Sequence, residues 1–344
     1  MVNTQMKPHQ PTIVRSLQLR PVTMDDMDRV LGLVNAFSRH YLGVDELDKA
    51  EVCNFWSAPG LNMAEDLRLL VTAEGEALGY VECASLDSPP VHHFIWLRVH
   101  PEYLSQGLEE RLIAWAEQRA HSMLELCPPD LRVSIQTFIP AQVKPYAAML
   151  ESHSYALIRH SFMMAIKLAE APIAPAWSLD FELRPFIEEG DLQAVYQAYD
   201  EAFSDHYGHV KRPFEASLKR FRHMLIEDET YDPGLWFLAW DGDEVAGLSL
   251  CFPYSSEDLE MGWLALPDVP RRWRKRGLGK ALLLHTFEEF RKRGQKRVGL
   301  GVDASNLTGA VKLYEDVGMH VARQYDRYEK ELRSGKELMT TELS

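Results

Sequence analysis

The sequence has few of the features that mark disulfide-bonded, metal-binding or membrane proteins. Its four cysteines, Cys53, Cys83, Cys127 and Cys251, lie far apart, with no Cys-x-x-Cys pair and no histidine at the spacing of a metal ligand. Neither a disulfide framework nor a zinc site is therefore expected. No apolar run approaches the roughly 20 residues that cross a bilayer. We expect reduced thiols, no metal and no membrane segment.

Positive charge is also scarce, because 37 Lys and Arg stand against 51 Asp and Glu, a formal net charge of -14. This balance argues against nucleic acid as a partner, since phosphate contacts need a basic face. It suits a cationic substrate, and solubility explains it equally well. The first residues, MVNTQMKPHQPTIVRS, lack the apolar core of a secretory signal, so the expected location is the cytoplasm. Monomer and homodimer both stay open.

A length of 344 residues predicts about two domains, and the sequence repeats itself. The segments "LQLRPVTMDDMDRVLGLVNAF" (17–37) and "FELRPFIEEGDLQAVYQAYDEAF" (181–203) share Leu-Arg-Pro and an acidic helix start. The segments "LRLLVTAEGEALGYVECAS" (67–85) and "LWFLAWDGDEVAGLSLCFP" (235–253) share two strand patterns around a tight turn. Equivalent segments lie about 170 residues apart, which indicates duplication of a whole domain.

The stretch "AEAPIAPAWS" (169–178) has the proline-rich, small-residue composition of a linker. It separates two predicted domains, 15–168 and 179–333. Each half has the order strand, helical region, three strands, helix, strand, helix and closing strand. This order predicts an α/β fold in each half, a mixed sheet flanked by helices.

One segment departs from the acidic character of the chain. Residues 271–297 hold 11 of the 37 Lys and Arg, beginning with "RRWRKRGLGKALL" at the start of a predicted helix. A helix start exposes unpaired N–H groups, and Gly277 and Gly279 allow close approach to the backbone. The pattern Arg-x-x-Gly-x-Gly suits a pyrophosphate and fits neither a Rossmann nor a P-loop motif. A solvated basic helix start whose glycines only form a turn is the alternative.

Together with "NLTGAVKLYEDVGM" (306–319), this loop resembles the acyl-CoA-binding half of the GNAT superfamily of N-acetyltransferases. The tandem arrangement is similar to the two-domain mycothiol synthase group. The resemblance implies two tandem GNAT-like domains, each with a mostly antiparallel sheet and a splayed V between its central strands. It also implies acetyl-CoA as the cosubstrate.

The resemblance implies roles for particular residues of the second half. The backbone at Val269 would pair with the pantetheine arm, and Asn306 would lie beside the CoA arm, with an N-cap as its alternative role. Tyr314 would protonate the departing thiolate, with packing beside Leu313 as its alternative. The amides expected to hold the pyrophosphate are those of Arg274, Lys275, Arg276, Gly277, Leu278, Gly279 and Lys280.

The general base is less well defined. Glu260, on the strand that enters the cleft, is the candidate, although its register differs by about three residues from that of family members. An exposed carboxylate at a strand end is the alternative. The segment "SDHYGHV" (204–210) is expected to shape the acceptor pocket, or else to be a polar surface loop.

When the two repeats are compared, the first half lacks most of the loop and tyrosine residues described above. In "HPEYLSQGLEERLI" (100–113), Leu104 replaces the leading Arg and Glu109 replaces the second glycine, where its carboxylate would repel a pyrophosphate. Further on, Leu150 stands opposite Tyr314 and Ser154 opposite Gly318. We expect this domain to be a scaffold or substrate wall that does not bind acetyl-CoA productively.

These features predict an N-acetyltransferase that transfers an acetyl group from acetyl-CoA to a primary amine of a small molecule, with the chemistry in the second domain. Two alternatives remain. One is acetylation of a peptide or protein amine, which a long groove between the domains would favour. The other is a non-catalytic acyl-CoA sensor.

Overall fold

The computed structural model describes residues 17–340, apart from 86–87, 173–179, 205 and 306–308. The first half contains β1 (Gln18–Pro21), α1 (Met27–Leu42), α2 (Lys49–Trp56), α3 (Met63–Asp66), β2 (Leu67–Val71), β3 (Ala77–Ala84), β4 (His92–Val99), α4 (Leu108–Ser122), β5 (Val133–Pro140), α5 (Lys144–Ser152) and β6 (Ala156–Lys167). The second half contains β7 (Glu182–Pro185), α6 (Glu188–Phe203), α7 (Phe214–Leu225), β8 (Trp236–Asp241), β9 (Glu244–Phe252), β10 (Met261–Asp268), α8 (Leu278–Lys292), β11 (Arg297–Asp303), α9 (Ala310–Asp316) and β12 (His320–Arg333). Short 3₁₀ turns are η2 (Met24–Asp26), η3 (Pro101–Tyr103), η4 (Leu124–Leu126), η5 (Pro233–Leu235) and η6 (Arg271–Trp273). The predicted order of elements is therefore present in both halves.

The repeated Leu-Arg-Pro motif has the same structural role in each half. Arg20 donates to both carboxylate oxygens of Asp26 at 2.6 and 2.7 Å, and Arg184 lies 3.1 Å from Asp191. The Arg20 guanidinium holds the pKa of the buried Asp26 carboxyl well below its usual range. Each arginine thus ties the first strand of its half to the start of the following helix.

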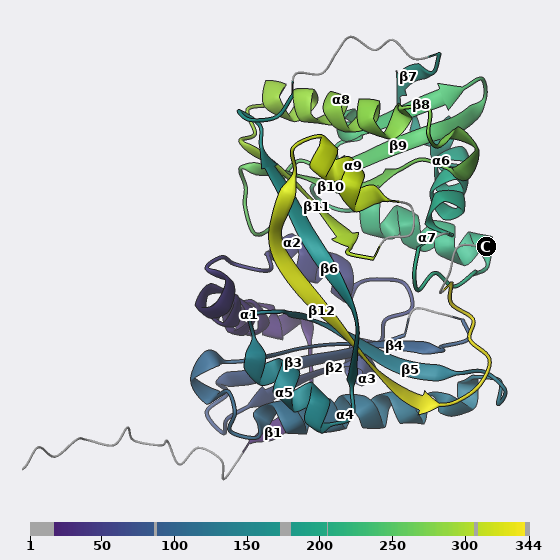
Figure 1. Cartoon of the computed structure of the whole chain (residues 1–344). Coiled ribbons are helices and arrows are strands. Elements are labelled where there is room, and N and C mark those ends of the chain that lie inside the picture. Colours follow the sequence, from purple (N-terminus) through teal and green to yellow (C-terminus); the bar gives the residue numbers. More distant parts are fainter. Residues whose placement is uncertain (1–16, 86–87, 173–179, 205, 306–308, 341–344) are drawn as a thin grey trace, which may run out of the picture.

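All strands belong to one 12-stranded sheet in the order β1-β2-β3-β4-β5-β12-β6-β11-β10-β9-β8-β7 (Figure 1). The closing strands are exchanged between the halves. β6, from the first half of the sequence, pairs with β11, and β12, from the second half, pairs with β5. β6 and β12 also pair with each other along most of their length. The sequence predicted the closing strands and did not predict their exchange.

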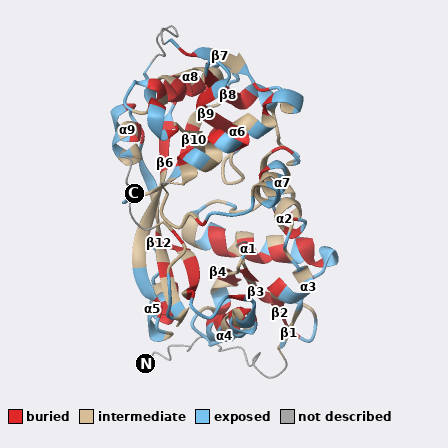
Figure 2. Cartoon of the chain, turned by 90° about the vertical axis from the view of Figure 1, so that its right-hand side faces the viewer, coloured by how far each residue is buried: buried red, intermediate tan, exposed pale blue. Residues whose placement is uncertain are grey.

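Buried residues gather into separate cores at the two ends of the molecule (Figure 2). In the second half, α8 packs on the sheet through Leu283, Phe287 and Phe290. In the first half, α4 makes the corresponding contact through Leu112 and Ile113. Within the residues described, no helix combines the length and the apolar character needed to cross a bilayer.

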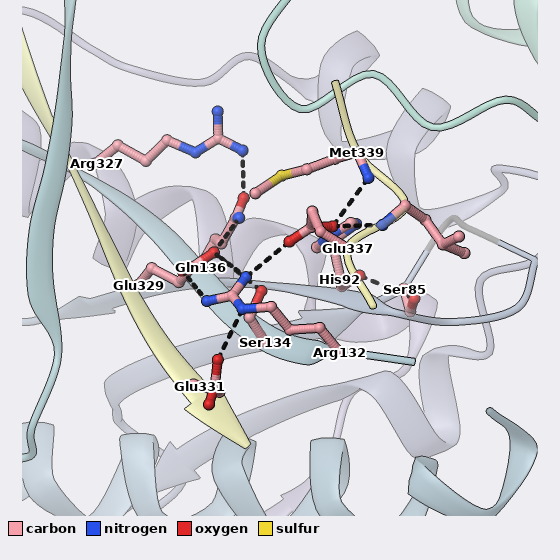
Figure 3. A network of polar contacts seen from close by, with 11 residues as sticks. Ser85, His92, Arg132, Ser134, Gln136, Arg327, Glu329, Glu331, Glu337 and Met339 are labelled. Carbon is pink, nitrogen blue, oxygen red and sulfur yellow. Dashed lines mark hydrogen bonds and ion pairs between the residues drawn. The ribbon is translucent and has the colours of Figure 1, made fainter. Parts of the chain in front are cut away.

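A polar network locks the exchanged β12 onto β5 (Figure 3). Arg132 donates to Glu329 at 2.5 Å, to Glu331 at 2.8 Å and to Glu337 at 3.0 Å. Ser134 and Gln136, from β5, also donate to Glu329. Because Glu329 is largely buried, these donors replace the water that its carboxylate would otherwise bind.

The segment after β12 returns to the second half. Glu337 accepts the amide of Met339, and Thr340 exchanges backbone hydrogen bonds with Gly208 and His209 at 2.9 Å. Gly208 and His209, between α6 and α7, are therefore hydrogen-bonded to the segment that follows β12.

Candidate active site

The central strands of the second half separate at one defined point. β10 and β11 pair in parallel from Met261 with Arg297 to Leu264 with Leu300. Beyond that, β10 shifts register at the bulge between Leu264 and Leu266 and continues alongside β9. β11 continues alongside β6. This separation is the splayed V that the resemblance predicts.

The loop that follows β10 has the same backbone conformation as its counterpart in the first half. Lys275 and Gly277 have positive φ angles of 62° and 82°, and Ser105 and Gly107 have φ angles of 60° and 86°. Gly277 precedes α8 in the left-handed conformation, which side chains disfavour. Two loops with one backbone trace can therefore be compared side chain by side chain.

In the second half, the start of α8 keeps its amides available. The first bond of the helix runs from the amide of Ala281 to the carbonyl of Gly277 at 3.0 Å, so the preceding amides have no acceptor within the helix. A Cβ atom at Gly279 would lie 3.3 Å from the Leu313 side chain and 3.7 Å from that of Val269. Gly279 therefore lets the helix start lie close to α9 and β10.

The basic side chains of the loop divide into two groups. Arg272 forms an ion pair with Glu244 and stacks on Trp273, whose indole donates to Asp241 at 2.9 Å. The guanidinium of Arg274 donates to the carbonyl of Val269 at 2.8 Å. These residues brace the loop, and Arg274 also lines the adjoining cavity. Arg271, Lys275 and Lys280 line the cavity as well, whereas Arg272 and Arg276 do not.

The cavity beside this loop has a volume of about 580 Å³ and extends along the split edge of β10. That volume lies within the range of small-ligand sites. The residues of the motif that line it are Val269, Arg274, Lys275, Gly277, Leu278, Gly279, Lys280 and Tyr314. The structure therefore brings these predicted residues together around one space.

Tyr314 reaches the cavity from α9 and is only 6% exposed. Burial, helped by the charge of Asp268, raises the pKa of its phenol. The hydroxyl is therefore protonated and neutral at physiological pH. The amide of Val269 donates to Oδ1 of Asp268 at 2.8 Å, and Oδ2 of Asp268 lies 3.3 Å from Nε2 of His206. A pantetheine carbonyl would have to replace the first of these bonds.

Two candidate residues do not join this group. Glu260 is exposed and lies 3.2 Å from Arg297, at the closed end of the paired strands. It lines neither this cavity nor the one described below. Asn306 lies outside the described residues.

The first half fills the corresponding anion site with its own carboxylate. Glu109, at the position of Gly279, is 3% exposed and accepts the amide of Ser105 at 2.7 Å. The amide of Ser105, whose counterpart in the second loop is the amide of Lys275, is thus occupied here. The sequence predicted repulsion of a pyrophosphate, and the structure shows a carboxylate seated in its place.

The amide of the first half that corresponds to that of Val269 also has a side-chain acceptor. The amide of Val99, which corresponds to Val269, donates to the buried hydroxyl of Tyr146 at 2.9 Å. β4 has no bulge to match that of β10, because its pairing with β3 is regular. The sequence offered no signal for Tyr146, since the matching residue of the second half is Ala310.

A second cavity, of about 480 Å³, lies between the halves. Trp263 and Gly301, next to the last paired residues of β10 and β11, line it. Their neighbours Leu264 and Leu300 belong to the core beneath α8, and alternate strand residues point to opposite faces. The cavity therefore opens on the other face of the sheet, at the point where the strands split. Glu46 and Glu51 of the first half also line it.

The comparisons with known proteins decide the family. Residues 31–135 and 192–319 match the Acetyltransferase (GNAT) family. The chain is a member of the GNAT family. A mycothiol acetyltransferase of Corynebacterium glutamicum (strain ATCC 13032) is 36% identical to this GNAT chain over 301 residues, 84% of this chain and 89% of the relative. One from Pseudarthrobacter chlorophenolicus is 27% identical over 239 residues, 68% of each chain.

Solved structures agree with this result. A GCN5-related N-acetyltransferase from Sphaerobacter thermophilus is 31% identical, with a TM-score of 0.77 over 95% of this GNAT chain and 99% of that chain. A tandem GNAT protein of the clavulanic acid pathway, at 15% identity and a TM-score of 0.68, shares the fold over 93% of this chain and 100% of its own. The predicted tandem GNAT fold is confirmed, and the protein is an N-acetyltransferase that uses an acyl-CoA donor.

Proposed function

We propose that this enzyme transfers the acetyl group of acetyl-CoA to a primary amine of a small molecule. In this proposal residues 179–333 carry the chemistry and residues 15–168 provide the scaffold and the acceptor wall. The observation that carries the proposal is the contrast between the two loops of equal backbone shape. In the first loop the Glu109 carboxylate accepts the amide of Ser105, whereas Gly279 brings no such acceptor to the second loop.

The donor would lie in the 580 Å³ cavity. Its pyrophosphate would accept the amides at the start of α8, with Lys275 and Lys280 nearby, and its pantetheine arm would follow β10 at Val269. The thioester would then reach the split between β10 and β11. There its carbonyl carbon faces the second cavity, where an amine has room to approach.

The acceptor nitrogen must be neutral to attack, although at pH 7 only of order 0.1% of an alkyl amine is neutral. The nitrogen bonds to the carbonyl carbon, the carbon–sulfur bond breaks, and the thiolate takes the proton of Tyr314. The proton lost by the amine restores the phenol. We assign no part in this step to Glu260, because it lies at the closed end of the strands.

Three features support a small acceptor in the cytoplasm. The second cavity has the size of a small-molecule site and lies between the halves, where a peptide substrate would need an open groove. The curated relatives are named for acetylation of mycothiol, a small molecule. The four cysteines are free thiols, as expected in a reducing compartment.

The test is release of free CoA from acetyl-CoA across a panel of small amines and short peptides, for the wild type and for Tyr314→Phe. We expect release with a small amine, and a strong loss in the variant without loss of CoA binding. Binding of CoA without release for any amine would instead support a sensor. Faster release with peptides would favour the protein-directed alternative.

A further inference from the structure

The first half contains a third cavity, of about 200 Å³, whose walls are mainly aromatic. Phe55, Trp56, Phe94 and Trp96 line it. The rings of Phe55, Phe94 and Trp96 are only partly buried, so they present surface to the space. Aromatic faces arranged around a small space attract alkylammonium ions.

Two carboxylates face this aromatic cavity, Glu51 from α2 and Glu82 from β3. Glu82 is held in place by a chain of hydrogen bonds. The indole of Trp56 donates to the Tyr80 hydroxyl at 3.0 Å, and that hydroxyl donates to Glu82 at 2.7 Å. In the described part of the chain, neither Glu51 nor Glu82 forms an ion pair with Lys, Arg or His, and Glu51 accepts the amide of Asp48 at 3.4 Å. The site therefore has two carboxyl groups without a cation of its own.

Comparison of the two repeats shows that this arrangement is particular to the first half. In the matched segments "LGYVECAS" (78–85) and "AGLSLCFP" (246–253), Tyr80 stands opposite Leu248 and Glu82 opposite Leu250. Both leucines are buried in an apolar core. A carboxylate at a position that the fold fills with leucine costs desolvation energy. Such a substitution is explained when the carboxylate has a cationic ligand.

The aromatic cavity is connected to the reaction site through Glu51. This residue lines both the aromatic cavity and the 480 Å³ cavity that opens at the split strands. The nearest cation, Arg98, stacks on Trp96 and is already paired with Glu46 at 2.5 and 2.9 Å. A molecule extending from the split to the aromatic cavity would therefore meet unpaired carboxylates at its far end.

We propose that the acceptor is a diamine or polyamine cation, acetylated at one amine while a distal ammonium group lies in the aromatic cavity between Glu51 and Glu82. This inference rests on the proposed function and specifies its substrate class. An ammonium there would contact the aromatic faces and both carboxylates, and its alkyl chain would occupy the cavity between the halves. The first half, which has no available CoA site, would thus select the acceptor.

The environment of the carboxylates agrees with this role. Burial raises the pKa of Glu82 to about 7, and burial together with the charge of Asp48 raises the pKa of Glu51 to about 7, although Glu51 remains accessible from the cavity. A bound ammonium favours the charged carboxylates and would lower both pKa values. Binding near pH 7 is therefore expected to release protons.

The test measures binding by calorimetry in the presence of CoA, so it does not depend on turnover. The probes are α,ω-diaminoalkanes of four, six and eight carbons, with butylamine as the monoamine. We expect at least one diamine to bind at least about tenfold more tightly than butylamine, with proton release near pH 7. Glu82→Gln and the more accessible Glu51→Gln should each remove most of this preference. Glu74→Gln, an exposed change in the β2–β3 turn, should retain it.

Equal affinity for butylamine and every diamine would overturn the inference. So would a diamine preference that survives both Glu51→Gln and Glu82→Gln. Failure of the proposed function has a different signature, because it would appear as no CoA release with any amine, whatever the calorimetry shows.

Discussion

Replacement of Gly279 by Glu would transfer the carboxylate of the first half into the second. The backbone traces of the two loops agree at Lys275 with Ser105 and at Gly277 with Gly107, so a glutamate at position 279 should reach the amides as Glu109 does. We expect it to accept the amide of Lys275, the counterpart of Ser105. The CoA site would then be filled from within the protein.

The magnitude follows from the bond that Glu109 makes. Its carboxylate accepts the amide of Ser105 at 2.7 Å. A hydrogen bond to a charged group contributes about 1.5 kcal/mol or more. Loss of one such bond from a pyrophosphate amounts to about tenfold in Kd. Repulsion between carboxylate and pyrophosphate adds to this loss.

The assay is calorimetric titration of CoA into the wild type, Gly279→Glu and Gly279→Ala. The alanine control places a Cβ 3.3 Å from the end of the Leu313 side chain, a flexible neighbour, so its Kd should change by about twofold. Thermal unfolding would confirm that both variants are folded. If Gly279→Glu binds CoA as the wild type does, the pyrophosphate does not lie on these amides and the comparison of the two loops is wrong.

Three further predictions concern single side chains. Tyr314→Phe should lower kcat by about a hundredfold and leave the Kd for CoA unchanged; an unchanged kcat would exclude the acid role. Tyr146→Phe should leave the buried amide of Val99 without an acceptor and lower the free energy of unfolding in urea by about 1 to 3 kcal/mol, and no loss would contradict that bond. The pKa of Glu82, raised to about 7, lies above its unfolded value of about 4.3, so the stability that its proton contributes is complete below pH 4.3 and is lost as the pH rises toward 7. Denaturant titrations should therefore show that, between pH 5 and pH 8, the free energy of unfolding of the wild type falls relative to that of Glu82→Gln by up to about 3 kcal/mol. Parallel plots of the two unfolding free energies against pH would refute this.

Much of the fold and part of the site could be predicted from the sequence because the signals are local. Hydrophobic periodicity, the Leu-Arg-Pro repeat and the tight turns are read from neighbouring residues, and they gave the order of strands and helices in both halves. The glycines and basic residues before α8 predicted an anion site for the same reason. Tyr314 was predicted from the resemblance to the family, and the structure places it beside the loop in one cavity.

The sequence did not predict the positions of residues that are set by strand pairing. Glu260 directly precedes β10 and was predicted to lie in the cleft, but the parallel pairing of β10 with β11 places it at the closed end of these strands. Tyr146 is separated from Val99 by almost 50 residues of sequence, and no local pattern links a hydroxyl on α5 to that amide. Arg274 was expected beside the anion, and its guanidinium also holds the carbonyl of Val269.

The sequence by itself determined the duplicated α/β plan and the half that contains the Arg-x-x-Gly-x-Gly loop, because periodicity, turn residues and glycines act over a few neighbours. Only the tertiary structure decided that β6 and β12 change places, that Glu109 accepts the amide of Ser105, and that Glu51 and Glu82 line one aromatic cavity. These features depend on groups that the sheet brings together from distant segments of the chain. No local sequence pattern indicates which of those segments will pair.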